Sequence, residues 1–151
     1  MENSKKNTLF GVFGGILFSI IGGALWYLFY QIGLIAGLSV IFGLPLTILG
    51  YRLFCRQKNL KSVLISVFIT LFSIVIAWYL CLCCDVYTIH NHWYNSGEIS
   101  YSLSFFEAVK SAGIYLTEPK VGVYYWRDLG VGAVLCLIVS IFPISLALEK
   151  K

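Results

Sequence analysis

The sequence has very little charge, and long stretches of it have none. Only 12% of its 151 residues are Asp, Glu, Lys or Arg, whereas soluble domains average about 25%. No charged residue lies between Lys6 and Arg52, a stretch of 45 residues. As one helix this stretch would be roughly 67 Å long, but the hydrocarbon core of a bilayer is only about 30 Å thick. The stretch is therefore predicted to cross a membrane twice, as a helical hairpin.

Two further uncharged runs, at 62–84 and 129–148, contain 23 and 20 residues, and each is long enough for one crossing. The chain is 59% hydrophobic, with a mean hydropathy of +0.84, and it would aggregate in water unless lipid solvated it. We predict an all-α polytopic membrane protein, with a single membrane domain over 1–151. Its expected spans are about 8–30, 33–54, 62–84 and 128–148.

The common sequence motifs of enzymes are also missing. There is no G-x-S-x-G, H-E-x-x-H, P-loop or dinucleotide-binding pattern. No charged residue or histidine falls in the central part of any predicted span, where proton and ion pathways usually carry one. The sequence thus favours a protein that is not an enzyme and needs no cofactor. A passive route lined by serine, threonine and backbone groups stays open.

The basic residues are concentrated in three segments, namely the N-terminus, the connection between the second and third spans, and the C-terminus. They are Lys5, Lys6, Arg52, Arg56, Lys58, Lys61, Lys150 and Lys151. Because cytoplasmic loops carry an excess of Lys and Arg, both termini are predicted to be cytoplasmic. So few cations, without a fold that presents them together, do not indicate binding to nucleic acid.

The segment 85–127 is expected on the outer side of the membrane. Its first part, 85–97, is polar and aromatic and is predicted to be a loop. Apolar residues in 100–116 recur at nearly helical spacing, and Ser104 with Glu107 fits a capping box. We therefore predict a helix that lies on or dips into the outer interface, ended by the residues around Pro119.

Small residues recur along the first two spans, mostly at intervals of four. The candidate packing residues are Gly11, Gly15, Ser19, Gly23, Gly33, Gly37 and Gly43. Small residues at this spacing let helix backbones approach closely in lipid. Two uses are open: packing within the hairpin, or association of several copies, for example around a pore.

Cysteines are clustered near the outer end of the third span. Cys81 and Cys84 have the C-x-x-C spacing, which is one helical turn and is used by thiol oxidoreductases. A complete redox system normally has a second pair, and none is visible. Apolar packing in lipid, acylation or a stabilising disulfide would equally account for cysteines at these positions.

A metal site is a further hypothesis for this region. Cys83, Cys84, Asp85, His90 and His92 offer thiolate, carboxylate and imidazole groups, which are ligands of zinc and copper. Their spacing is not that of a compact metal motif. Alternatively, the two histidines belong to a loop and have no metal role.

The first hairpin resembles a known group of proteins. The residues that carry the resemblance are Gly23, Ala24, Leu25, Trp26, Gly33, Ile35, Ala36, Gly50, Tyr51 and Leu53. The segment 104–108 (SFFEA) adds to it. These residues are similar to those of uncharacterised small four-helix integral membrane proteins of Gram-positive bacteria. The chain departs from them in Ile32, in its cysteine cluster and in its His-x-His segment. The resemblance implies a fold and a bacterial plasma membrane, but no activity.

The leading expectation is a non-enzymatic integral membrane subunit that acts through helix–helix association, in an accessory, modulator or immunity-type role. Its partners would be the lipid bilayer and either a membrane protein or further copies of the same chain. One alternative is a homo-oligomeric channel or passive transporter. The other is an outer-face thiol-redox or metal-binding membrane protein.

Overall fold

All regular elements of the structure are helical. The structure, a computed structural model, describes residues 2–55 and 59–149. Its elements are α1 (Glu2–Gln31), the short 3-10 helix η1 (Ala36–Ser39), α2 (Val40–Cys55), α3 (Leu60–Asn95), α4 (Phe105–Tyr115) and α5 (Pro119–Leu148). No strand occurs within the described ranges, and the predicted all-α class is confirmed.

Four helical segments are long and apolar enough to cross a membrane. They are Asn7–Gln31, Ala36–Cys55, Leu60–Asn95 and Pro119–Leu148. The prediction of an integral membrane protein with four membrane-spanning helices is therefore supported by the elements that the chain forms. Four of the basic residues used to predict the topology, Arg56, Lys58, Lys150 and Lys151, lie outside the described residues.

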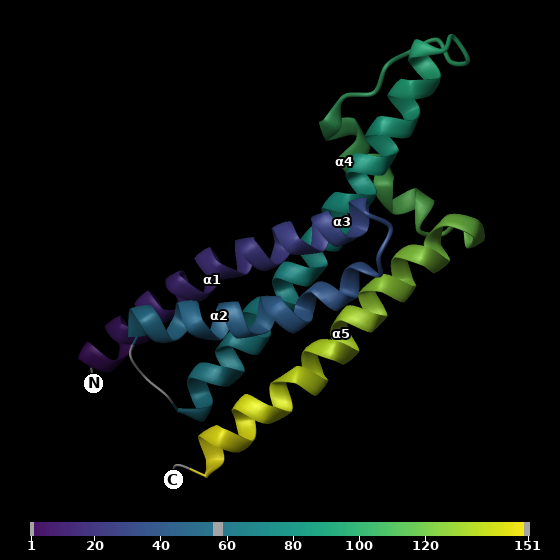
Figure 1. Ribbon diagram of the computed structural model, residues 1–151. Helices are drawn as coiled ribbons and strands as arrows, with labels where there is room; N and C mark the ends of the chain where they lie inside the picture. The colour runs from purple at the N-terminus through teal and green to yellow at the C-terminus, as the bar shows by residue number, and fades with distance from the viewer. Residues whose placement is uncertain (1, 56–58, 150–151) are drawn as a thin grey trace.

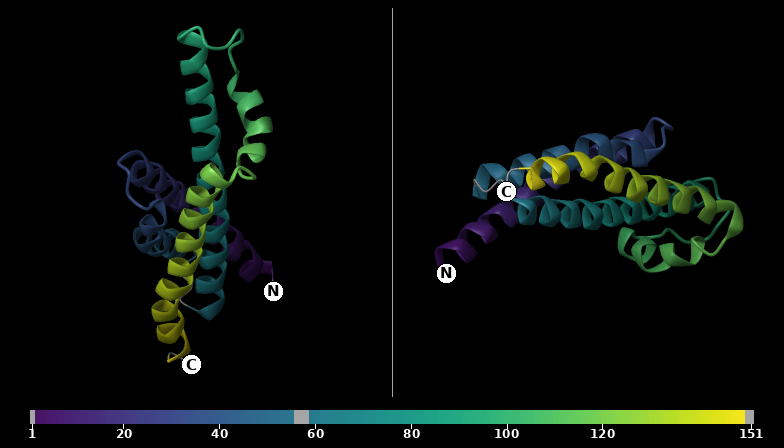
Figure 2. Two further views of the ribbon diagram at one scale, coloured as in Figure 1. Left: turned by 90° about the vertical axis from the view of Figure 1, so that its right-hand side faces the viewer. Right: turned by 90° about the horizontal axis from the view of Figure 1, so that it is seen from below.

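The first two spanning helices form an antiparallel hairpin that crosses the pair α3–α5 obliquely (Figure 1). The beginning of α1 and the end of α5 lie at one end of the molecule, and the α1–α2 turn lies toward the other end (Figure 1). The two views of Figure 2 show α4 alongside the far half of α3. We call the end that carries the α1–α2 turn and α4 the outer end.

Glycines end both α1 and α3. Gly33 has a φ of 75° and Gly97 a φ of 80°, a region that glycine adopts without steric cost. After α1, the N–H of Leu34 donates to the carbonyl of Phe29 at 3.0 Å and the N–H of Gly33 donates to that of Tyr30 at 3.1 Å. This Schellman pattern satisfies the last carbonyls of the helix and starts the turn toward α2.

The prediction of a loop over 85–97 was wrong, because α3 continues to Asn95. The segment is polar, but it contains no glycine or proline before Gly97, so nothing breaks the helix. The outer segment also packs against this extension. Asn91 accepts a hydrogen bond from the N–H of Leu103 at 3.0 Å and donates to the Leu103 carbonyl at 2.9 Å.

The outer helix α4 begins and ends where the sequence indicates. Ser104 caps it, and the Ser104–Glu107 capping box is present. The hydroxyl of Tyr79 in α3 donates to the carbonyl of Val109 at 2.7 Å, which fixes α4 against α3. The last helix, α5, begins at Pro119, so the proline lies in its first turn. It is therefore longer at its N-terminal end than the predicted span at 128–148.

Candidate functional site

Glycine pairs bring the backbones of α1 and α2 into contact. A Cβ atom on Gly14 would lie 2.5 Å from the carbonyl oxygen of Gly50, and a Cβ atom on Gly22 would lie 3.2 Å from the Cα of Gly43. Gly43 belongs to the predicted packing set, whereas Gly14, Gly22 and Gly50 do not. Gly14 and Gly22 lie about two helical turns apart, and this spacing places them together on a second face of α1.

The predicted glycine and serine residues of α1 face other helices of the same chain. A Cβ atom on Gly11 would lie 2.7 Å from the Cβ of Cys55 in α2, and one on Gly15 would lie 2.9 Å from the side chain of Ile69 in α3. The hydroxyl of Ser73 in α3 donates to that of Ser19 at 2.8 Å. A Cβ on Gly23 would meet Ala77 of α3 at an ordinary 3.8 Å.

The remaining predicted glycines have different roles. A Cβ atom on Gly37 would lie 2.6 Å from the backbone nitrogen of Gly132 in α5. Gly132 in turn faces the indole of Trp26, which a Cβ would approach to 2.7 Å. Gly33 has nothing within 4 Å and serves the turn instead. Apart from Gly33, the predicted packing residues therefore lie against helices of their own chain.

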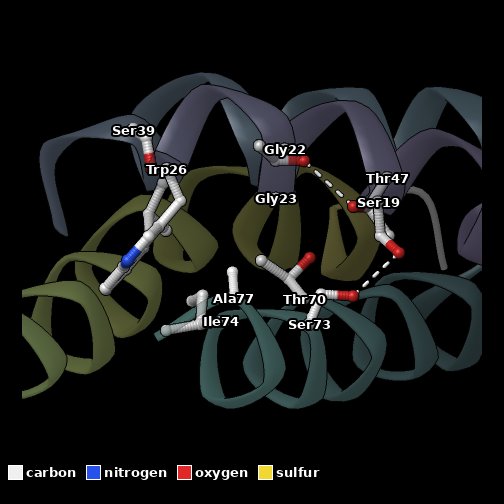
Figure 3. Close-up of a pocket in the computed structure, with 12 residues that line it drawn as sticks. Ser19, Gly22, Gly23, Trp26, Ser39, Thr47, Thr70, Ser73, Ile74 and Ala77 are labelled. Atoms are coloured by element: carbon white, nitrogen blue, oxygen red, sulfur yellow. Dashed lines mark hydrogen bonds between the residues drawn. The ribbon is translucent and has the colours of Figure 1, made fainter. Parts of the chain in front are cut away.

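Hydroxyl groups gather where the hairpin crosses α3 (Figure 3). Ser19, Ser39, Thr47, Thr70 and Ser73 line a cavity of about 20 Å³. Thr47 donates to the carbonyl of Gly43 and Thr70 to that of Ser66, both at 2.9 Å. A cavity of this size holds about one water molecule. This cavity is far too small to serve as a passive route through a single chain.

The clustered cysteines are not joined by a disulfide in the structure. Cys81, Cys83 and Cys84 are all free thiols. Cys81 is only 2% exposed, and Cys84 lines an apolar groove described below. Exchange with a second thiol needs a thiolate that an incoming sulfur can reach. The burial of Cys81 denies it that access, whereas Cys84 is partly exposed.

The predicted metal ligands are not brought together either. Within residues 2–55 and 59–149, no three His, Cys, Asp or Glu side chains form a group that could hold a metal ion. Because α3 stays helical through the segment, successive side chains are rotated by about 100° around the helix axis. The candidate ligands therefore point in different directions. Cys83 is fully buried, whereas His92 is exposed. The ring of His90 packs against Tyr101, with 4.9 Å between centroids.

Asp85 instead joins three helices at the outer end. Its carboxylate accepts hydrogen bonds from the hydroxyls of Tyr30 in α1 and Tyr125 in α5, and these two hydroxyls lie 2.9 Å apart. Nearby, Asp128 is 7% exposed and pairs with Arg127 at 3.0 Å. The tyrosine cluster was not predicted from the sequence, because Asp85 was placed in a loop and no local pattern links the three residues.

Two cavities adjoin Asp85 and Tyr125. One has a volume of about 340 Å³ and is also lined by Tyr30, Arg127 and Asp128. The other, which we call the aromatic cavity, has a volume of about 230 Å³ and lies between α3, the end of α4 and the start of α5. Besides Asp85 and Tyr125, it is lined by Leu82, Val86, Ile89, His90, Trp93, Tyr115 and Val121.

A long apolar groove runs between α1 and α3, and we call it the α1–α3 groove. It has a volume of about 870 Å³. Its floor consists of the small residues Ser19, Gly23, Ser73 and Ala77. Its sides are exposed bulky residues, namely Ile16, Ile20, Tyr27, Phe68, Phe72, Ile76 and Leu80, with Phe105 of α4 also lining it.

Comparison with protein-family models, with curated proteins and with solved structures gives no significant match. The function is therefore inferred from the geometry of the chain itself.

Proposed function

We propose that this chain is a non-enzymatic integral membrane subunit that acts through helix–helix association. Its α1–α3 groove receives a transmembrane helix of a different membrane protein, in an accessory, modulator or immunity-type role. The membrane is a bacterial plasma membrane, and both termini lie in the cytoplasm. The observation that carries the proposal is the groove itself, with its floor of small residues and its apolar sides.

The floor of the groove suits a helix. In lipid, water does not drive helices together, and association depends on close packing, which small residues permit. Ser19 and Gly23 of α1 lie four residues apart, as do Ser73 and Ala77 of α3. The floor therefore offers small residues on consecutive turns of both helices, while the exposed rings of Phe68 and Phe72 extend the contact sideways.

A helix of another protein fits this groove better than a second copy does. A closed dimer of identical chains joins the same patch on both sides, so the groove of each copy would have to be filled by the exposed side chains that border the groove of the other. Insertion of another face of the chain into the groove would be a head-to-tail contact, which builds rings or open filaments. A different partner avoids both difficulties.

The proposal is tested by filling the groove. A Cβ on Gly23 has ordinary contacts, so Gly23→Leu would project its isobutyl group into the groove without a backbone clash. Gly130→Leu on α5, where nothing lies within 4 Å, is the matched control. The chain is extracted from its native membranes in mild detergent, and the mass of its complex is measured.

We expect wild type and Gly130→Leu to run as a complex with one further membrane protein, and Gly23→Leu to run alone. A complex that survives Gly23→Leu would overturn the proposal. A wild-type complex that contains only copies of this chain would favour the homo-oligomeric alternative instead.

A further inference from the structure

We propose that the polar cavity at the outer end binds the phosphoethanolamine headgroup of a phospholipid. The polar cavity is the one of about 340 Å³ that Tyr30, Asp85, Tyr125, Arg127 and Asp128 help to line. This inference does not rest on the proposed partner helix, because the cavity and the α1–α3 groove share none of their lining residues. It rests on two carboxylate oxygens, a guanidinium beside them and the depth of all three in the membrane.

The first carboxylate oxygen is Oδ1 of Asp85. Tyr30 and Tyr125 both donate to the other oxygen, Oδ2. Oδ1 receives no hydrogen bond from the described residues, and it is not one of their buried, unpaired side-chain atoms, so a ligand can reach it. Tyr30 lines the polar cavity and not the aromatic cavity. Its bond to the Asp85 carboxylate therefore places that group at the polar cavity.

The second carboxylate oxygen is Oδ2 of Asp128. Arg127 donates to Oδ1 of Asp128 through Nε at 3.1 Å and Nη2 at 3.0 Å. Within residues 2–55 and 59–149, Oδ2 receives no hydrogen bond, although it too is not a buried, unpaired atom. Asp128 is only 7% exposed, and it lines the polar cavity. A primary ammonium has three N–H donors and would serve the two open oxygens from inside the cavity.

Arg127 supplies the complementary charge. Its side chain is 50% exposed, and its Nη1 makes no hydrogen bond with the part of the chain that the structure describes. The guanidinium carbon lies 5.6 Å from the centre of the Tyr124 ring, which also lines the cavity. A guanidinium matches the geometry of a phosphate group. Arg127 would repel a simple cation, and the two aspartates would repel a simple anion, so a ligand with both charges fits best.

The position of the cavity favours a lipid as the carrier of these charges. Asp85 directly follows the uncharged run 62–84, and Asp128 directly precedes the uncharged run 129–148. The cavity therefore lies where the hydrocarbon core ends and the headgroup region begins. Leu34 and Tyr124 also line it and are 48% and 63% exposed. They offer apolar surface to the part of the lipid that joins the headgroup to its acyl chains.

The test uses the purified full-length chain in mild detergent near neutral pH. Native mass spectrometry measures the binding of phosphatidylethanolamine and of phosphatidylcholine with the same acyl chains. Phosphatidylcholine keeps both charges, but three methyl groups replace its N–H donors. We expect phosphatidylethanolamine to bind at least about tenfold more tightly, because hydrogen bonds to charged groups contribute at least that factor. Equal affinities, or no binding of phosphatidylethanolamine, would overturn the proposal without the need for any variant.

Two variants separate the two ends of the headgroup. In Asp85→Asn the amide oxygen still accepts from the tyrosines, but the carboxylate charge is lost. This variant should weaken binding of phosphatidylethanolamine by about tenfold or more and leave that of phosphatidylcholine unchanged. Arg127→Gln removes the phosphate contact that both lipids share, so it should weaken both and keep the preference for phosphatidylethanolamine. A loss confined to phosphatidylethanolamine in Arg127→Gln would contradict the phosphate contact.

Matched controls remove the same charges from exposed positions at the outer end. They are Glu98→Gln and Lys120→Gln, and both should bind the two lipids as wild type does. If each control weakened binding as much as its partner variant, general surface attraction would account for the binding, and the site would be rejected.

Free phosphoethanolamine tests whether the ligand is a lipid. It carries the same two charged groups without acyl chains, and it should compete with phosphatidylethanolamine only when present in large excess. If it competed as well as the lipid itself, a phospholipid would be ruled out as the ligand.

Discussion

Tyr30 and Asp85 are 55 positions apart in the sequence, and the Tyr30 hydroxyl donates a hydrogen bond to the Asp85 carboxylate. Tyr125 donates to the same oxygen, so a single carboxylate holds the outer ends of α1, α3 and α5 together. The indole N–H of Trp78 adds a second link between α3 and α5, because it donates to the carbonyl of Tyr125 at 2.7 Å. These contacts fix the wall between the two outer cavities.

Removal of one tyrosine hydroxyl should loosen this junction. Tyr30→Phe is expected to lower the free energy of unfolding by about 1 kcal/mol, within the range measured for hydrogen bonds between membrane helices. Unfolding in mixed detergent and denaturing micelles measures the change. Tyr27→Phe, on the exposed side of α1, is the matched control, and equal stabilities of the two variants would contradict the role of Tyr30.

The α1–α2 contact should tolerate no side chain at Gly14. In Gly14→Ala, the added Cβ would lie 2.5 Å from the carbonyl oxygen of Gly50 and would also strike the ring of Phe54. The backbones must then separate, at a cost of about 1–3 kcal/mol. Gly130→Ala, where nothing lies within 4 Å, should be neutral or stabilising in the same unfolding assay. A Gly14→Ala protein as stable as wild type would refute the close approach.

The cap of α4 should depend on pH. The Ser104 hydroxyl and backbone N–H both donate to the Glu107 carboxylate, at 2.6 and 2.8 Å, and they lower its pKa below the ordinary 4.5. Because the pKa is lowered in the folded chain, the cap is fully present above the ordinary pKa and is lost as the pH falls through the lowered value.

An NMR titration of the Glu107 carboxyl group checks this prediction. In Ser104→Ala the pKa of Glu107 should rise toward 4.5, because one donor is removed and the turn is weakened. An unchanged pKa in this variant would show that the cap does not control Glu107.

Thiol labelling distinguishes the cysteines of α3. Cys84 is partly exposed and lines the groove, whereas Cys81 is 2% exposed. N-ethylmaleimide should therefore modify Cys84 of the detergent-solubilised chain well before Cys81, as peptide mass spectrometry can follow. Mobility on a gel should be the same with and without reductant, since all five cysteines are free. A disulfide between Cys81 and Cys84 in the isolated protein would support the redox hypothesis.

The sequence alone predicted the spanning helices because a helix that crosses the hydrocarbon core needs a long apolar stretch with few or no charges. The uncharged runs identified all four spanning segments, and the pair Ser104 and Glu107 correctly placed the start of α4. The end of α3 was missed because polarity was taken as a sign of a loop. When a helix extends beyond the apolar region, its polar residues indicate contact with water and not the end of the helix. Here α3 ends only just before Gly97, which has a positive φ.

The candidate sites were less predictable, since they depend on contacts between distant residues. Spacing identified the small residues of α1 but not which neighbour each would face. Gly15, for example, lies closest to Ile69 of α3 and somewhat farther from Thr47 of α2. Nothing in the local sequence brings Tyr30, Asp85 and Tyr125 together, because their meeting depends on how the hairpin crosses α3 and α5.

The most direct test of the proposed helix–helix association is photocrosslinking from within the groove in native membranes. A photoreactive phenylalanine analogue replaces Phe72, which is 69% exposed in the groove, or Phe142 on α5, which is 70% exposed and outside it. We predict that the analogue at position 72 crosslinks to a hydrophobic span of one other protein. Gly23→Leu should abolish this crosslink, and Gly130→Leu should keep it. The analogue at position 142 should give only lipid adducts. Lipid adducts alone from Phe72 would contradict the account.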